Sequence, residues 1–121
     1  MKPFTDQAIT QIVKELIANG NLKIVCEKKI VLTDNQVCQM YPDKIGSEMF
    51  SALQEYMTSG ESTALIIGGD EAVRKLLEIK GKGGPTGFGI RKIYSTDRIR
   101  NIMHTSDSEE EALREIKVLR I

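Results

Sequence analysis

The chain contains a single histidine, His104, within the segment NIMHTSDS at residues 101–108. Histidine is the side chain whose unperturbed pKa lets it act as a base, an acid or a nucleophile near neutral pH. A lone histidine in a short apolar segment is also a common structural residue. The surrounding sequence therefore has to decide between a chemical and a structural role for His104.

An acidic helix is predicted directly after this segment. Ser108 and Glu111 have the spacing of a capping box, and the three glutamates at 109–111 suit the positive end of a helix dipole. The buried stripe of this helix would consist of Ala112, Ile116 and Leu119. His104 would thus lie just before a well-capped helix.

Composition limits the function classes that the chain can serve. Its 121 residues suit one domain, 1–121, and 17 basic against 17 acidic residues leave no net charge for a broad nucleic-acid or anionic-membrane surface. Cys26 and Cys38 form no metal-binding motif and are expected to be reduced thiols. No apolar run reaches membrane-spanning length, and no signal-peptide pattern opens the chain, so we expect a cytoplasmic protein.

Apolar periodicity predicts helices and strands in one mixed order. Predicted helices lie between Asp6 and Gly20, between Thr33–Asp34 and Pro42, between Asp43 and Gly60, after Asp70 and after Ser108. Predicted strands cover residues 22–32, 63–67 and 98–103. We therefore expect an α+β sandwich in which helices cover a small sheet.

A glycine-rich stretch, GKGGPTGFG, occupies residues 81–89 and contains five glycines and one proline. This composition predicts a loop, since neither a helix nor a central strand tolerates it. Backbone N–H groups in such a loop could contact phosphate, but the stretch matches neither the P-loop nor the dinucleotide fingerprint.

Several motifs together resemble those of one family. The segment NIMHTSDS with Glu115 in the following helix is similar to the active-site segment N-I-[IMV]-H-G-S-D-S of nucleoside diphosphate kinases. EYMTSG at 55–60 resembles the family's x-Y-M-x-S-G helix end, Gly89-Ile90-Arg91 stands at the family's spacing before the histidine, and Lys2-Pro3 resembles the start of K-P-D-G. The resemblance covers nearly the whole chain and implies a ferredoxin-like βαββαβ sandwich with a small antiparallel sheet.

The resemblance also implies a reaction. The family moves the γ-phosphate of a nucleoside triphosphate to a nucleoside diphosphate through a phosphohistidine, with Mg²⁺ bound to the nucleotide. His104 would carry the phosphoryl group, Glu115 would accept a hydrogen bond from its imidazole, and Ser106 would support the histidine loop and the glutamate.

The same resemblance assigns the nucleotide contacts. Lys2 and Arg91 would neutralise charge on the phosphoryl group, Tyr41 would hydrogen-bond the phosphates, and Asn101 would meet the sugar hydroxyls. Because the family forms dimers built into tetramers or hexamers, a homo-oligomer is expected.

The chain departs from the family pattern at several positions. The family's first strand, which precedes K-P-D-G, is missing or truncated, since only Met1 stands before Lys2. Phe4 replaces the aspartate of K-P-D-G, and Leu77 replaces the second phosphate-binding arginine. Thr105 replaces the glycine after the histidine, and Met49 and Arg98 stand at the two base-clamp positions. Candidates to replace lost phosphate contacts are Thr86, Lys80 and Lys82. These departures favour the alternative of a catalytically weak or inactive module for nucleotide binding or protein assembly.

Overall fold

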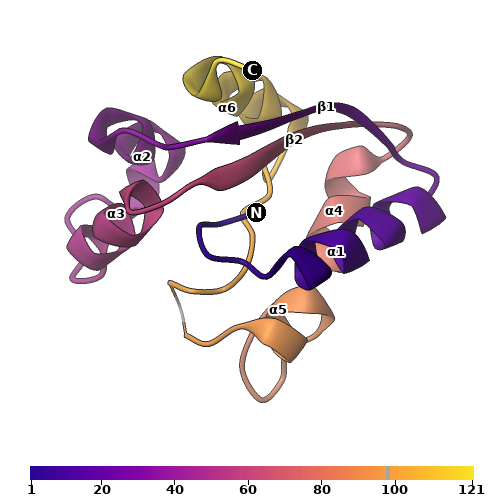
Figure 1. The fold of residues 1–121 in the computed structure, drawn as a ribbon, viewed down its shortest axis with the longest axis horizontal. Coiled ribbons are helices and arrows are strands. Elements are labelled where there is room, and N and C mark those ends of the chain that lie inside the picture. The colour runs from indigo at the N-terminus through magenta and orange to yellow at the C-terminus, as the bar shows by residue number, and fades with distance from the viewer. Residues whose placement is uncertain (98) are drawn as a thin grey trace.

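The computed structural model describes residues 1–97 and 99–121 and has the predicted α+β class (Figure 1). The helices are α1 (Gln7–Asn19), α2 (Asp34–Met40), α3 (Phe50–Thr58), α4 (Ala72–Lys80), α5 (Gly89–Tyr94) and α6 (Glu109–Leu119), with a short 3-10 helix, η1 (Pro42–Lys44), after α2. The strands are β1 (Lys23–Ile30) and β2 (Ser62–Gly68). Within the described ranges, no helix is long and apolar enough to cross a membrane.

The two strands form an antiparallel pair in which Lys23 lies opposite Gly68 and Ile30 opposite Ser62. On the other edge of β2, the amino group of Met1 donates to the carbonyl of Thr63 at 2.7 Å, and the N–H of Thr63 donates to the carbonyl of Met1 at 3.0 Å. In an antiparallel ladder, alternate residues direct their backbone groups to the same side, so 65 and 67 also face this edge. Beyond Thr63, no described backbone group pairs with that edge.

Apolar side chains form two separate clusters. Helices α2 and α3 lie toward one end of the strand pair, and α1 and α4 toward the other (Figure 1). The first cluster joins α1, α4 and α5 and contains the fully buried Val13 and Ile17. The second joins α2, α3 and α6 and contains Val37, Leu53 and Tyr41. Because an isolated two-stranded sheet is only marginally stable, these helices must supply most of the stabilisation.

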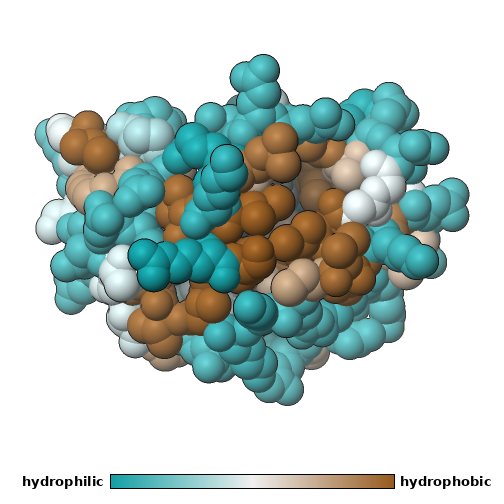
Figure 2. Space-filling view, turned by 90° about the horizontal axis from the view of Figure 1, so that it is seen from above, coloured by the Kyte–Doolittle hydropathy of each residue, from teal (hydrophilic) through white to brown (hydrophobic). Residues whose placement is uncertain are grey.

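An apolar cavity of about 200 Å³ lies along the open edge of β2. Its lining comes from β2, from α1, α4 and α6, and from Met103–Ser106. Figure 2 shows apolar side chains gathered across one face between hydrophilic margins, with a hollow among them. A cavity needs only about 10–15 Å³ to hold one water molecule, so this cavity is large enough for several.

The strand predicted at 98–103 is not found. Residues 99–103 contain no strand, and the prediction for residue 98 lies outside the described residues. Ile102 has a φ of +77°, and the N–H of Met103 donates to the carbonyl of Asn101 at 2.9 Å, so the chain turns here. The cavity lies between this segment and β2. Among the described residues, one backbone hydrogen bond joins the segment to the N-terminus, from the N–H of Lys2 to the carbonyl of Ile102 at 2.8 Å.

The helix predicted from Asp43 was correct at its end but wrong at its start. Gly46, with a φ of +87°, turns the chain, and α3 begins only at Phe50. The helix predicted after Thr33 is found. The Thr33 hydroxyl accepts from the N–H of Gln36 at 3.1 Å, and the N–H of Thr33 donates to Oε1 of Gln36 at 2.9 Å, which completes a capping box.

Two further boundaries differ from the prediction. Asp70 does not cap α4, because Glu71 intervenes in the left-handed region with a φ of 54°. The glycine-rich stretch is mostly loop as predicted, but its last glycine, Gly89, opens the six-residue helix α5. Residues 90–94 contain no glycine or proline, so their composition permits a short helix.

Candidate active site

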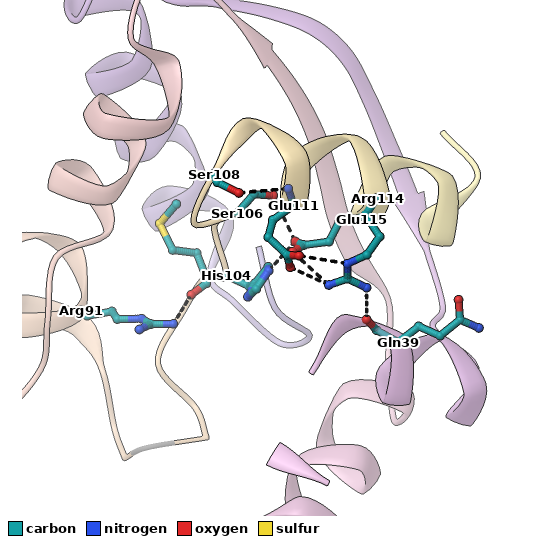
Figure 3. Close-up of polar contacts among 9 residues, drawn as sticks. Gln39, Arg91, His104, Ser106, Ser108, Glu111, Arg114 and Glu115 are labelled. Atoms are coloured by element: carbon teal, nitrogen blue, oxygen red, sulfur yellow. Dashed lines mark hydrogen bonds and ion pairs between the residues drawn. The ribbon is translucent and has the colours of Figure 1, made fainter. Parts of the chain in front are cut away.

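The imidazole of His104 is paired with the carboxylate of Glu115. Nε2 of His104 lies 2.6 Å from Oε1 of Glu115, which is buried on the inner side of α6 (Figure 3). A neutral imidazole bound to a carboxylate in this way carries its proton on Nε2 and keeps the lone pair on Nδ1. The His104 side chain is 25% exposed, so a ligand can reach it.

Glu115 is held by two neighbours. The hydroxyl of Ser106 donates to the same Oε1 at 3.0 Å, and Nη2 of Arg114 lies 3.7 Å from Oε2. Sequence reasoning identified Ser106 but missed Arg114. That arginine also donates to the carbonyl of Gln39 at the end of α2, a contact across 75 residues for which the sequence carries no signal (Figure 3).

The start of α6 is capped only in part as predicted. The Ser108 hydroxyl accepts from the N–H of Glu111 at 3.1 Å. The Glu111 carboxylate pairs with Arg114 at 2.7 Å and does not return to the cap residue, so the predicted capping box is only half formed. Arg114 therefore joins the first turn of α6 to Glu115 and to α2.

Tyr41 and Arg91 bring unpaired donors to the site. The ring of Tyr41 lies edge-on to that of His104, with centroids 5.1 Å apart. Burial raises the pKa of the Tyr41 hydroxyl, so this group stays protonated as a donor. Arg91 donates from Nη2 to the carbonyl of Met103 at 2.8 Å. Among the described residues, the Tyr41 hydroxyl and Arg91 Nε are buried without a hydrogen-bond partner, which suits an anionic ligand.

Lys2 and Asn101 lie together although 99 residues separate them. Nζ of Lys2 donates to the side-chain carbonyl of Asn101 and to the carbonyl of Ile99, the latter at 3.0 Å. Burial, together with the positive charges of Arg91 and Lys80, lowers the pKa of Lys2 to about 7. A bound anion would favour its charged form.

A cleft of about 760 Å³ brings together five of the predicted site residues, namely Lys2, Tyr41, Met49, Arg91 and Asn101. His104 lines the neighbouring apolar cavity with Ser106 and Glu115, whereas Lys2 and Tyr41 line both spaces. Arg98 lies outside the described residues. Thr105, at the position of the family's glycine, has no positive φ; the strained residue of this segment is Ile102.

Comparison with known proteins identifies relatives of the whole chain. A model of the family described as "Nucleoside diphosphate kinase" matches residues 1–119. The nucleoside diphosphate kinases of Hydrogenovibrio crunogenus and Staphylothermus marinus are 38% and 36% identical to the chain, over 89% and 92% of its length and 78% and 80% of theirs.

Solved structures agree with this match. The Aquifex aeolicus nucleoside diphosphate kinase has a TM-score of 0.77 at 28% identity, covering 93% of this chain and 83% of its own. A halophilic nucleoside diphosphate kinase from Halobacterium salinarum, solved in complex with CDP, has a TM-score of 0.77 at 27% identity, covering 91% and 75%. The chain described here therefore belongs to the nucleoside diphosphate kinase family.

Proposed function

We propose that the protein is a phosphotransferase that moves a γ-phosphate from a nucleoside triphosphate to a nucleoside diphosphate through a phosphohistidine at His104. The strongest support is the hydrogen bond between Nε2 of His104 and Glu115, because it leaves Nδ1 as the nucleophilic atom. The proposal also rests on membership of the family and on the donors of Tyr41 and Arg91 beside the imidazole.

The reaction proceeds in two half-reactions. The lone pair of Nδ1 attacks the γ-phosphorus, a P–N bond forms, and the bond to the β–γ bridging oxygen breaks, so that the diphosphate leaves with the electron pair. A terminal oxygen of a second diphosphate then attacks the phosphorus and breaks the P–N bond. The carboxylate of Glu115, 2.6 Å from Nε2, stabilises the positive charge that the ring gains in between.

The neighbouring cleft would hold the nucleotide. Lys2 and Arg91 would neutralise phosphate charge, and Tyr41 would donate its unpaired hydroxyl. Asn101 would contact the sugar, and the apolar lining that includes Met49 would contact the base. The family resemblance assigns a second base contact to Arg98, which lies outside the described residues. Mg²⁺ enters as part of the nucleotide substrate, bound to the phosphate oxygens that it prefers. The relative from Halobacterium salinarum was solved with CDP, which supports nucleotide binding in this fold.

Labelling tests the proposal directly. Incubation with γ-labelled ATP and Mg²⁺ should yield an acid-labile phosphoprotein whose label passes to added diphosphate, and His104→Ala should abolish it. Glu110→Ala, an exposed residue on the same helix, should label normally. Wild-type protein that binds ATP but stays unlabelled would refute the catalytic role.

The second candidate is a module that binds nucleotide or assembles without phosphoryl transfer. The specific observation in its favour is Leu77 on α4, where the family resemblance places a second phosphate-binding arginine. Nucleotide binding without a phosphoenzyme, in protein whose fold is intact by circular dichroism, would favour this candidate.

Self-association belongs to the same proposal, and we expect a homo-oligomer: a dimer, tetramer or hexamer. No described backbone group pairs with the edge of β2 beyond Thr63. Strand β1 exposes Val25 at 66%, and Val31, just after the strand, is exposed at 60%. Edges and apolar patches of this kind favour pairing with another copy. The described residues form only two strands, β1 and β2, of the βαββαβ sheet that the family resemblance implies, while the fold as a whole matches two solved nucleoside diphosphate kinases at a TM-score of 0.77. Sedimentation velocity at micromolar concentration should show a species larger than 13.5 kDa, and a compact monomer would contradict the expectation.

A further inference from the structure

The glycine-rich loop is a closed hairpin that presents Lys82. The N–H of Lys82 donates to the carbonyl of Phe88 at 2.9 Å, and the N–H of Phe88 returns the bond at 2.9 Å. Lys92 on α5 ties the tip of the loop by donating from Nζ to the carbonyl of Gly84 at 2.8 Å. The backbone of Lys82 is therefore fixed against α5, the helix that carries Arg91.

The glycines of this loop permit the close crossing of its two arms. A Cβ on Gly81 would lie 1.9 Å from the carbonyl oxygen of Phe88, and a Cβ on Gly87 would lie 2.0 Å from that of Lys82. Real Cβ atoms do not approach backbone this closely, so only glycine fits at either position. The composition that broke the helix pattern in the sequence thus holds Lys82 in place.

The cleft beside this loop has an excess of positive charge. Its basic lining residues are Lys2, Lys44, Lys82, Arg91 and Lys92, and its one acidic lining residue among those described is Asp97. Asp97 is already engaged, since it accepts from the N–H groups of Ile99 and Arg100 at 2.8 and 2.7 Å and from the guanidinium of Arg100 at 2.8 Å. Among the described residues, its carboxylate forms an ion pair with Arg100 and with no lysine of the cleft, although its charge acts to raise the pKa of Lys2 against the larger effect of burial.

Three of these five cations have a hydrogen-bond partner among the described residues, and two do not. Lys2 bonds to Asn101, Arg91 to Met103 and Lys92 to Gly84. The ammonium groups of Lys44 and Lys82, by contrast, make no hydrogen bond or ion pair with any described residue, although both residues line the cleft. Lys44 ends η1, three residues after Tyr41, so the two free lysines approach the cleft from separate segments.

We propose that Lys82 and Lys44 bind the phosphate groups of the nucleotide in this cleft, where they replace phosphate contacts missing from this chain. The inference rests on the proposed function and deepens it, because it assigns the phosphate-binding residues of the same site. Ammonium groups without protein partners in a cleft whose carboxylate is occupied favour a polyanion over a neutral ligand. The rigid hairpin lets Lys82 bind without the entropy loss of ordering a loop.

Calorimetric titration of the full chain with ADP and Mg²⁺, and separately with inorganic tripolyphosphate, tests the inference. Lys82→Ala and Lys44→Ala should each weaken binding by between about 10- and 100-fold, the usual loss for one charge-assisted hydrogen bond. Lys82→Arg should retain most of the affinity. Lys28→Ala, an exposed lysine on β1 outside the cleft, should bind as the wild type does. In steady-state assays, Lys82→Ala should raise KM with kcat nearly unchanged, because the contact would be lost equally from the bound substrate and from the transition state.

The outcomes separate this inference from the proposed function. Wild-type affinity in both alanine variants, with folds intact by circular dichroism, would overturn the role of the lysines while leaving the phosphohistidine reaction standing. Weakened tripolyphosphate binding in Lys82→Ala, in a protein that never forms phosphohistidine, would retain the lysine site and overturn the reaction. Wild-type protein that binds neither ADP nor tripolyphosphate would overturn both.

Discussion

The aromatic ring of Tyr41 lies edge-on to the imidazole of His104, with an interplanar angle of 67°. Its hydroxyl is buried and, among the described residues, unpaired. A buried polar group without a partner destabilises the fold that contains it. The contact therefore combines a structural cost with a donor placed next to the predicted nucleophile.

Tyr41→Phe should separate these two effects. Removing the unpaired hydroxyl should leave the free energy of unfolding unchanged or raise it by up to about 1 kcal/mol. The rate of His104 phosphorylation should fall about tenfold, because one donor to the phosphate is lost. Urea denaturation and single-turnover labelling measure the two quantities. A variant that is less stable but equally active would show that the hydroxyl serves packing alone.

Glu115→Gln should slow phosphoryl transfer by at least about 100-fold, since the amide still contacts the imidazole but no longer stabilises its positive charge. Ser106→Ala removes only one of the hydrogen bonds to Glu115 and should slow transfer about fivefold. Rapid-quench measurement of phosphohistidine formation distinguishes the two. Equal effects in both variants would show that the orientation of Glu115, and not its charge, limits the rate.

Lys2 should make nucleotide binding depend on pH. Its pKa is lowered to about 7, chiefly by burial, and a bound phosphate should raise it toward the ordinary value, so binding above pH 7 should take up a proton. Affinity for ADP should fall as pH rises from 7 to 9. Titrations in buffers of different ionisation enthalpy measure the uptake, which Lys2→Met should abolish.

The lowered pKa of Lys2 also makes the stability of the fold depend on pH. Between about pH 7 and the ordinary lysine pKa of 10.5, the unfolded chain keeps the Lys2 proton that the folded chain has released. The unfolded state then binds more protons, so the contribution of Lys2 to the free energy of unfolding rises with pH across this window. Comparing urea midpoints of the wild type and Lys2→Met at pH 6.5 and 9 isolates this contribution.

Gly81→Ala should be among the more destabilising single changes in the loop. Gly81 combines a φ of +67° with a Cβ position 1.9 Å from backbone, whereas Gly46 has a φ of +87° and open space around it. Gly46→Ala should lower the free energy of unfolding by about 1 kcal/mol, because of its backbone conformation alone. Gly81→Ala should lower it by at least about 3 kcal/mol. Similar losses in thermal unfolding would show that the hairpin can open to accept a side chain.

Sequence patterns predicted the elements in which apolar periodicity and a cap agree. α1 ends before Gly20, α2 begins at the Thr33 capping box, and β2 coincides with the apolar run after Glu61. His104 lies in the loop before α6, and Glu115 lies in the second turn of that helix, so the two are close in sequence and meet in space. The family resemblance implied this pairing.

Other features depend on contacts that no local pattern encodes. Residues 99–103 have strand-like composition, but a strand also needs a neighbour, and here an open cavity separates them from β2. α5 begins at a glycine, and the low helix propensity of glycine counts against predicting a helix there. The contact of Lys2 with Asn101 spans 99 residues and could not be inferred from spacing.

The division of the apolar side chains into two clusters has a consequence for cooperativity. The strand pair and residues 99–103 connect the two clusters, and an apolar cavity lies between them, so we expect the clusters to separate at a lower free energy than global unfolding requires. Tyr41 belongs to one cluster, while Ile90, next to Arg91, belongs to the other. If a nucleotide contacts Tyr41 and Arg91 as we propose, it would connect the two clusters, and its binding would then stabilise the fold as a whole.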